Sequence, residues 1–581
     1  SVDGDRATWL VAPPLPAVQP VSWDPGAGAL LDLRGGPAGT PPERVTVHVG
    51  ADRIALQAGD TPETIRVGGA ARIAAVSADP GIAGAETASG ALRLAPLAAG
   101  RTTVTVRSLD DPWAQAVFTV DVGAPFAAPR ATTLPAATAY PARGERGVPP
   151  DTPLRLVFAE EPVLSGEGSV RVYRKRDQAL IAVIRPGETV IAMGPAQRQR
   201  LVRQHPIRVL GKELYVRMPV ALERGLEYEA VVDARLVRAK GFRGARWSFR
   251  TTPFKPVGDS VTVDVIGRAD FRTVQGALDH AMSLPREQAV TVNVRDGVYP
   301  ELLYLVDKDN VMLRGQSREH TIVRAANSDT RNPGSGTGQP SGSAGVTGGR
   351  AQFLAQDVDM LELRDIALHN STRRSDGHSA QAETIFFASD QGRLIARNAH
   401  FISEQDTLQL HGYAWFYKSL IEGNVDFVWG NNRAALFEDS ELRTLGDSAN
   451  PQSGGYIVQA RTVGKDEPGF VFLRSRLTRG PGPAGNLPPI GATYFARSPG
   501  TANTWDNVAF IACSVGPHIA QEAWYRKPAP NPLEGGWREY GNKDEDGQPR
   551  TYGGFQMERA QAERLSNRAA VFAGRGWNPQ P

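Results

Sequence analysis

Two aspartates in the middle of the chain stand at a spacing that would let them work as a pair. Asp406 lies in the stretch QDTL and Asp426 in VDFVWG, and 426 − 406 gives twenty positions. If the chain returns to the same place every twenty residues, the two carboxyl groups lie on neighbouring strands, about 4.8 Å apart. Like charges this close raise the pKa of one group and leave the other ionised. Such a pair offers a proton donor beside an anion, as combined acid–base and nucleophilic chemistry requires.

Two glutamines accompany the aspartates. Gln405 precedes Asp406, and Gln381 lies 24 positions earlier (405 − 381), roughly one longer turn of the same repeat. Side-chain amides at these places can donate N–H groups to a developing oxyanion. An alternative interpretation involves no chemistry, because Gln-Asp and Asp-x-Phe pairs also cap turns. Spacing alone leaves both interpretations open.

Apolar runs recur around this pair at a similar step. The runs RLIARNAHFIS, WFYKSLIEGN and AALFEDSELRT place Asn398, Ser419 and Asp439 in the same position, with gaps of 21 and 20. A repeat of this length indicates stacked supersecondary units. These units hold short β-rich runs and leave no room for a helix. Each is therefore predicted to be one coil of a parallel β-helix, in residues 256–581.

The chain before this repeat predicts two β-sandwich modules. Residues 1–125 have an irregular Pro/Gly-rich start, followed from Arg44 by short alternating segments with regular turn signals. A second set of such segments fills residues 126–255, and its phrase GVPPDTPLRLVFAEEPV weakly resembles bacterial immunoglobulin-like modules. We expect both modules to act as spacers. A carbohydrate-proximity role is the alternative.

Helical periodicity is confined to the two ends of the predicted β-helix. FRTVQGALDHAMSL, residues 271–284, has apolar residues at helical steps and is expected to cap the first coil. The tail 557–572 also favours a helix, which could lie back on the coils. Between them, residues 327–349 are low in complexity and predict a flexible insertion that lacks a phosphate-binding motif.

Composition narrows the class of protein. The 581 residues include 65 basic and 62 acidic side chains without a long basic run, which argues against nucleic acid or a membrane surface as partner. No apolar run is long enough to span a membrane. The single cysteine, Cys513, is predicted to be a buried core residue. The nine histidines form no zinc-binding pattern, so neither metal nor cofactor is expected. The chain opens SVDGDR without a signal peptide, so export is neither indicated nor excluded.

From Val257 onward the chain resembles the pectin methylesterase family. The matching pieces, in order, are FRTVQGAL, DGVYPE, QDTL, GNVDFVWG, VQAR, GFVF and EYGN. The strongest is GNVDFVWG, similar to the family's Gly-x-x-Asp-Phe-Ile-Phe-Gly. The resemblance implies an all-β fold with a right-handed parallel β-helix. It also implies hydrolysis of methyl esters of pectin, that is methylated homogalacturonan, by a monomeric enzyme that is secreted or periplasmic in a bacterium.

The resemblance also assigns roles to individual residues. Asp426 would be the nucleophile that attacks the ester carbonyl carbon. Asp406 would be the general acid that protonates departing methanol, and then the base that activates water. Gln381 and Gln405 match the family's oxyanion-hole glutamines. Arg497, in YFARSPG, aligns with an arginine that hydrogen-bonds the nucleophile and keeps it ionised.

One departure from the family pattern concerns the substrate groove. After Arg497 the chain reads SPG, so the tryptophan that normally follows two residues later is missing. Phe386, Trp429 and Trp524 are the predicted substrate-binding aromatics, since sugar faces stack on such rings. The altered groove leaves two alternatives to a pectin methylesterase. One is an esterase or thioesterase with the same machinery for another acyl compound, and the other is a catalytically silent carbohydrate-binding β-helix.

Overall fold

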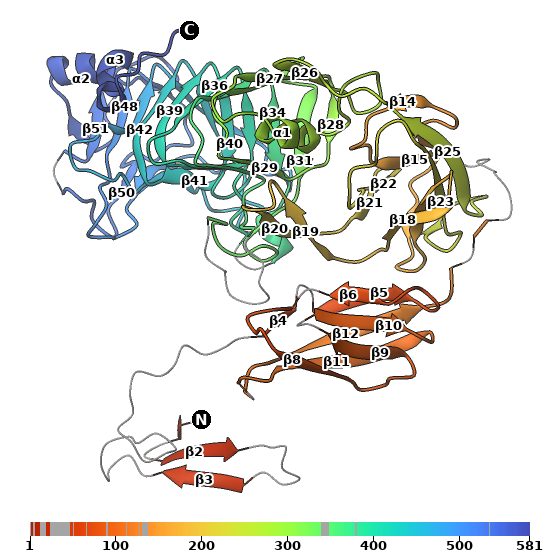
Figure 1. Ribbon diagram of the computed structural model, residues 1–581. Helices are drawn as coiled ribbons and strands as arrows, with labels where there is room; N and C mark the ends of the chain where they lie inside the picture. The colour runs from red at the N-terminus through yellow and green to blue at the C-terminus, as the bar shows by residue number, and fades with distance from the viewer. Residues whose placement is uncertain are drawn as a thin grey trace.

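In the computed structural model, the regular secondary structure is almost entirely β-strand (Figure 1). The structure describes residues 2–3, 6–11, 19–23, 47–49, 52–65, 67–88, 91–111, 113–126, 128–129, 137–337, 348–377, 380–533 and 535–581. Within these ranges, none of the helices has the length and apolar character needed to cross a membrane.

The C-terminal part winds into coils that add strands to three parallel sheets (Figure 1). The longest sheet contains β26 (Ser260–Val263), β27 (Val290–Val294), β30 (Val311–Gly315), β33 (Leu361–Arg364), β36 (Arg393–Arg397), β39 (Gly412–Tyr417), β42 (Asn432–Glu438), β45 (Gly469–Leu473), β48 (Val508–Ile511), β51 (Trp537–Tyr540) and β52 (Phe555–Gln556). The second contains β28 (Gly297–Tyr299), β31 (Thr321–Ala325), β34 (Ala367–Asn370), β37 (His400–Ile402), β40 (Leu420–Gly423), β43 (Glu441–Leu445), β46 (Arg476–Gly480) and β49 (Ser514–Val515). The third, which we call the site sheet, contains β29 (Leu303–Val306), β32 (Phe353–Gln356), β35 (Ile385–Ala388), β38 (Leu408–Leu410), β41 (Val425–Gly430), β44 (Tyr456–Ala460), β47 (Tyr494–Arg497) and β50 (Trp524–Tyr525). The predicted parallel β-helix is confirmed.

The interior of the coils is held by like side chains stacked on successive strands. Phe416, Phe437, Phe472 and Phe510 are paired along the longest sheet. Their ring centroids are 4.5, 4.7 and 4.5 Å apart. This is the strand spacing itself, so the rings stack without distorting the ladder. A slip of one residue in register would turn such a ring out of the core.

A left-handed residue closes the same turn of successive coils. Among the residues at this position are Asn398, Lys418 and Asp439, with φ of 46°, 51° and 50°. The pairing of His400 with Leu420 places Lys418, one residue before Ser419, level with Asn398. The predicted alignment of Ser419 with Asn398 and Asp439 is therefore wrong by one residue. Ser419 lies after the turn and points inward, where its hydroxyl accepts a hydrogen bond from the Ala399 backbone N–H at 3.2 Å.

Helices cover the first coil and one outer face of the β-helix. Helix α1 (Val274–Met282) packs its buried face onto the core of the first coil, as predicted. The Thr273 hydroxyl caps it by accepting from the Gly276 backbone N–H at 3.0 Å. The tail forms α2 (Arg559–Leu565), α3 (Arg568–Val571) and the 3₁₀ turn η3 (Ala573–Arg575), and its apolar side chains lie on the outer face of the longest sheet. The prediction for the tail is thus confirmed.

Two β-rich modules with separate apolar cores precede the β-helix. The first contains β4 (His48–Val49), β5 (Arg53–Gln57), β6 (Glu63–Ile65), β7 (Val67–Gly68), β8 (Ile73–Ser77), β9 (Ala83–Ala88), β10 (Ala91–Pro96), β11 (Gly100–Ser108) and β12 (Gln115–Gly123). The second contains β13 (Ala137–Tyr140), β14 (Arg146–Val148), β15 (Leu154–Phe158), β16 (Val163–Leu164), β17 (Val170–Arg174), β18 (Ala179–Ile184), β21 (Ile207–Leu210), β22 (Glu213–Val216), β23 (Glu227–Val232), β24 (Val237–Arg238) and β25 (Ala245–Thr251). Before them, β1 (Val2–Asp3), β2 (Arg6–Val11) and β3 (Gln19–Trp23) form a small antiparallel sheet. The immunoglobulin-like resemblance and the module boundaries stay predictions.

A hairpin of the second module leaves its sandwich and lies on the β-helix (Figure 1). We call this hairpin, β19 (Thr189–Met193) and β20 (Arg200–Gln204), the arm. Its turn passes so close to Tyr304 that a Cβ on Gly194 would lie 2.7 Å from the tyrosine ring. Gly194 also has φ of 80°, which favours glycine. The second module is therefore in direct contact with the β-helix, and its expected role as a spacer stays a prediction.

Candidate active site

The two aspartates lie on neighbouring coils of the site sheet. An isolated bridge pairs Gln405 with Val425, which places Asp406 beside Asp426. Both are buried, with 3% and 4% of their surface exposed. Both adopt left-handed backbone conformations, with φ of 61° and 49°, a region that aspartate tolerates better than most residues. The prediction that the two aspartates lie on neighbouring coils is confirmed.

The Asp426 carboxylate is held by a guanidinium and an amide. Arg497 Nε donates to Oδ1 at 2.8 Å, and its Nη2 donates to Oδ2. Gln459 Nε2 also donates to Oδ2, at 2.9 Å. Arg461 donates from Nε and Nη2 to the Gln459 Oε1 at 3.1 and 2.7 Å, which fixes that amide with its NH₂ group toward Asp426. Charge-assisted bonds of this kind stabilise an oriented carboxylate anion.

Asp406 has the opposite environment. Burial raises the pKa of its carboxyl well above the ordinary value, and the negative charges of Glu383 and Asp426 raise it further. Arg350, whose Nη2 lies 3.5 Å from Asp406 Oδ2, opposes this effect. The site thus pairs a carboxyl group whose pKa is raised by burial and negative neighbours with a carboxyl group on the next coil that accepts bonds from Arg497 and Gln459.

The two predicted oxyanion donors are oriented by arginines. Arg350 Nη1 donates to Gln381 Oε1 at 2.7 Å, and Arg374 Nη1 donates to Gln405 Oε1. Because each amide oxygen faces a guanidinium, each NH₂ group points the other way. Two such groups beside a nucleophilic carboxylate are suited to stabilise negative charge on a reacting carbonyl oxygen.

Arg350 joins several of these groups and was missed by the sequence analysis. Its Nε donates to both oxygens of the buried Glu383, at 2.8 and 3.1 Å. Burial raises the pKa of Glu383, and Arg350 opposes that rise. Two signals could have identified these residues. Glu383 follows Gln381 by two positions, and Arg350 is the charged residue between the low-complexity insertion and the next strand.

The structure brings one of the three predicted substrate-binding aromatics to the site. Trp429 lies there with its ring between the guanidinium groups of Arg350 and Arg461, at 5.6 and 4.9 Å. Phe386 lies beneath the arm. The Trp524 ring points into the core, where it stacks on Trp537 at 5.3 Å and its Nε1 donates to Glu539. Neither Phe386 nor Trp524 presents a ring face to a ligand, because strand alternation and the arm bury them.

A cluster of tyrosines beyond Asp426 was missed by the sequence analysis. Tyr456, Tyr494 and Tyr525 are half-buried, and their ring centroids are 5.2 to 5.6 Å apart. The Arg497 guanidinium lies 5.0 Å from the centre of the Tyr456 ring. Tyr525 follows Trp524 in β50, so alternation turns it outward when the tryptophan points inward. We call these three residues the tyrosine cluster.

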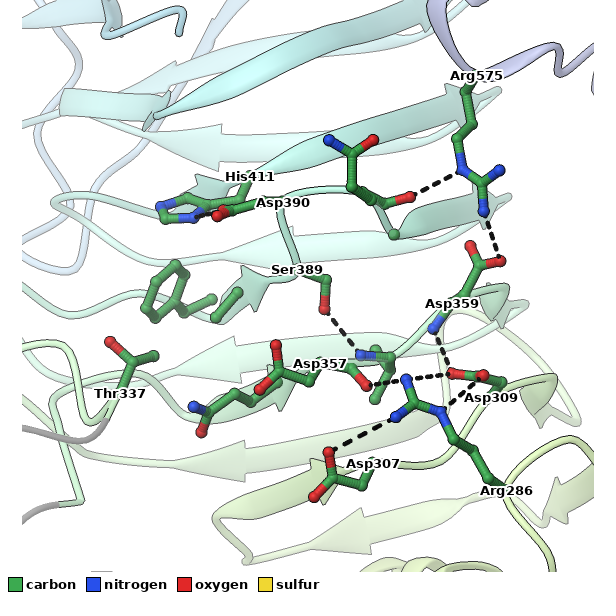
Figure 2. A pocket seen from close by; sticks show the side chains of 16 residues that line it. Arg286, Asp307, Asp309, Thr337, Asp357, Asp359, Ser389, Asp390, His411 and Arg575 are labelled. Atoms are coloured by element: carbon green, nitrogen blue, oxygen red, sulfur yellow. Dashed lines mark hydrogen bonds and ion pairs between the residues drawn. The ribbon is translucent and has the colours of Figure 1, made fainter.

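A cavity of about 770 Å³ lies away from the aspartate pair, past the other ends of the site-sheet strands (Figure 2). Five aspartates line it: Asp307, Asp309, Asp357, Asp359 and Asp390. Its cations are engaged in ion pairs, for example Arg286 Nε with Asp309 at 3.0 Å. An acidic lining of this kind disfavours an anionic polymer. This cavity is therefore distinct from the surroundings of the aspartate pair.

Comparison with known proteins identifies relatives of this chain. The sequence profile of the family described as Pectinesterase matches residues 260–560. The chain is 29% identical over 276 residues to the probable pectinesterase/pectinesterase inhibitor 64 of Arabidopsis thaliana, covering 46% of this chain and 42% of that protein. It is 25% identical over 220 residues to pectinesterase A of Dickeya chrysanthemi, covering 36% and 59%. The solved pectin methylesterase PemA from Erwinia chrysanthemi superposes with a TM-score of 0.45 at 22% identity, covering 55% of this chain and 98% of that one.

The family profile covers more than half of the chain and includes both aspartates, both glutamines and Arg497. The chain belongs to the pectinesterase family. It spans about two fifths of the Arabidopsis relative and about three fifths of the Dickeya one.

Proposed function

We propose that this protein is a carboxylic ester hydrolase that removes methyl groups from pectin. The observation that supports this best is the contrast between the two aspartates. Asp406 is buried beside negative charge, which favours its protonated form, whereas Asp426 accepts bonds from Arg497 and Gln459, which favour its anion. Membership of the pectinesterase family supports the choice of substrate.

In the proposed first step, an Asp426 oxygen attacks the carbonyl carbon of a galacturonate methyl ester. Negative charge develops on the carbonyl oxygen, where the NH₂ groups of Gln381 and Gln405 stabilise it. The carbon–methoxy bond then breaks, and Asp406 gives its proton to the departing methanol. The products of this step are methanol and an anhydride between the galacturonate and Asp426.

In the proposed second step, Asp406 is an anion and accepts a proton from water. The resulting hydroxide attacks the anhydride, the bond to Asp426 breaks, and the sugar leaves as a carboxylic acid that gives its proton to the solvent at neutral pH. Asp406 has regained its proton, and Asp426 is again an anion held by Arg497. The net reaction is ester plus water to acid plus methanol.

The first experiment is methanol release from highly methylated pectin by the full chain, beside the Asp426→Asn variant. We expect release by the wild type and loss of at least 10³-fold in the variant, because the nucleophile is gone. Asp439→Asn is a matched control, since Asp439 has a similar left-handed backbone (φ of 50°) but lies outside the site. It should keep wild-type activity.

The outcome separates the alternatives. Release from other esters or thioesters but not from pectin would favour a different acyl substrate. Binding of pectin without release from any ester would favour a silent carbohydrate-binding β-helix. Equal activity of wild type and Asp426→Asn would contradict the assigned nucleophile.

The remaining sequence predictions accompany this proposal. An insoluble or long polysaccharide substrate argues for secretion, or for the periplasm of a bacterium. The near balance of charge argues against a nucleic-acid partner, and a monomer is expected. No step of the proposed reaction requires a metal or organic cofactor.

A further inference from the structure

One ladder of side chains crosses the outer face of the site sheet. Strand pairing aligns Tyr304, Leu354, Phe386, Gln409 and Trp429 in successive coils. Their chain neighbours on the same strands point into the core. The ladder therefore forms the floor of this face from β29 to β41, the strand that carries Asp426.

The arm covers the first part of this floor. Its Met193 and Val202 pack with Tyr304, Leu354 and Phe386 in one apolar cluster. The covered rings and side chains are at most 2% exposed. Phe386 lies one coil before Asp406 and two before Asp426, or about 5 and 10 Å along the axis. Cover by the arm thus ends next to the reacting groups.

The arm is fastened along its second strand, β20. Arg200, 1% exposed, donates from Nη1 to the Leu303 carbonyl at 2.6 Å and from Nε to the Gly348 carbonyl at 2.7 Å. The backbone of Arg203 donates to Asn332 Oδ1 at 2.7 Å and accepts from its Nδ2 at 3.2 Å. These bonds fix the arm to β29 and to the first and last parts of the low-complexity insertion.

The arm is also fastened at its tip, where Arg198 Nη1 lies 2.6 Å from Asp307 and Nη2 contacts Asp357. The carboxylates belong to the turns that follow β29 and β32. A hairpin held at both ends and packed on an apolar floor is a fixed wall, because opening it would expose that floor to water.

The opposite side of the site is aromatic and is partly exposed to solvent. From the arm outward, successive strands carry Asp406, Asp426, then Tyr456, Tyr494 and Tyr525. All three tyrosines are half-buried, with rings that reach the surface. Aromatic rings provide flat apolar surface with polar hydroxyl groups, which suits the faces of sugar rings.

We propose that the arm closes one end of the substrate groove, so that the pectin chain binds from one side only. The polysaccharide extends over the tyrosine cluster, and its terminal part lies between the arm and Asp426. The enzyme then removes esters near one end of the chain in preference to esters in the interior. This inference rests on the proposed esterase function and adds the position of its substrate.

The test uses fully methylated oligogalacturonides of defined length, with the reducing end marked by ¹⁸O. Early products of the full-length protein are analysed by tandem mass spectrometry to locate the first ester lost. We expect the first loss at a fixed distance from one end, whatever the length of the oligomer. Loss spread over interior positions, on long and short oligomers alike, would overturn the proposal. Absence of methanol from every oligomer would instead count against the esterase function.

A variant tests the open side independently. Tyr525→Ala should raise KM for long oligomers several-fold, with little change for the shortest oligomer that is hydrolysed. Tyr173→Ala, at a half-buried tyrosine of the second module, is the matched control and should behave as wild type. An equal effect of Tyr525→Ala on short and long oligomers would contradict one-sided binding.

Discussion

At the scale of residues, the two aspartate carboxyl groups of the site differ in the residues that surround them. Asp426 accepts hydrogen bonds from Arg497 and Gln459. Asp406 is buried and lies near the negative charges of Glu383 and Asp426. Each glutamine amide is in turn oriented by an arginine. The chemistry of the aspartates therefore depends on residues that do not react.

The charge of Glu383 should set the alkaline limit of activity. Asp406 must be protonated to release methanol, and its protonated form is lost as pH rises through its raised pKa. Glu383→Gln removes a negative neighbour and leaves the charge of Arg350 less compensated. Both changes favour the Asp406 anion, so the alkaline limb of kcat/KM should move to lower pH. A pH–rate profile beside Glu362→Gln, on the outer face of the longest sheet, checks this. An unmoved limb would contradict the coupling.

Gln459 should act as a positioning residue for the nucleophile. Gln459→Leu removes its 2.9 Å bond to Asp426 and leaves the bonds of Arg497 in place. We expect kcat to fall by about 10²-fold, because small displacements of a reacting group are costly. KM should change little, as measured by methanol release. Gln391→Leu, at an exposed glutamine, serves as control, and a fall confined to KM would argue against the positioning role.

At the scale of elements, the arm supports the segment that carries Arg350. Arg200 donates to carbonyl groups of residues 348, 349 and 351, which flank Arg350. Arg350 in turn contacts Asp406, Gln381 and Glu383. Through these bonds the arm, a hairpin of the second module, supports the position of Arg350 in the site.

Arg200→Met should show this support. The change leaves buried carbonyl groups without partners, at about 1–3 kcal/mol each, so the thermal transition should fall by several degrees. Loosening of Arg350 should also alter the pH profile of kcat/KM. Arg198→Met is the matched control, because Arg198 is 35% exposed and surface ion pairs contribute about 0–1 kcal/mol. A stable Arg200→Met protein with an unchanged profile would contradict the argument.

At the scale of the whole molecule, the two modules contribute differently. The first contacts the second through Asp60, which accepts from Arg171 and Arg185. The second contacts the β-helix through the arm and through Asp151, which accepts from the Thr273 backbone N–H at 2.8 Å beside α1. The described contacts that reach the active site come from the second module.

Truncation should separate the modules. A chain that begins at residue 131 loses the first module. It should keep wild-type methanol release, because Arg171 and Arg185, which lose their partner Asp60, can then be solvated by water. A chain that begins at residue 256 also loses the arm and exposes Tyr304, Leu354 and Phe386. We expect it to aggregate or to lose most activity, as measured by size-exclusion chromatography and methanol release. Full activity of the shorter chain would contradict a role for the arm.

The sequence by itself determined the repeat, the helices at both ends and the catalytic pair. Asp406, Asp426, Gln381 and Gln405 lie in regular coils, so their separation along the chain translates directly into neighbouring strands. Helix α1 and the tail carry local periodicity of their own. Local patterns of this kind need no knowledge of the rest of the molecule.

Only the tertiary structure decided which side chains surround that pair. Arg350 enters from a loop beside a low-complexity insertion, and the arm that anchors this loop comes from about 150 residues earlier in the chain. No periodic spacing marks such contacts. For the same reason, the sequence predicted Phe386 as a ligand-binding residue, whereas the structure shows it covered by a hairpin that is distant in the chain. Residue types and repeat length specified the reacting groups, and long-range packing shaped the groove around them.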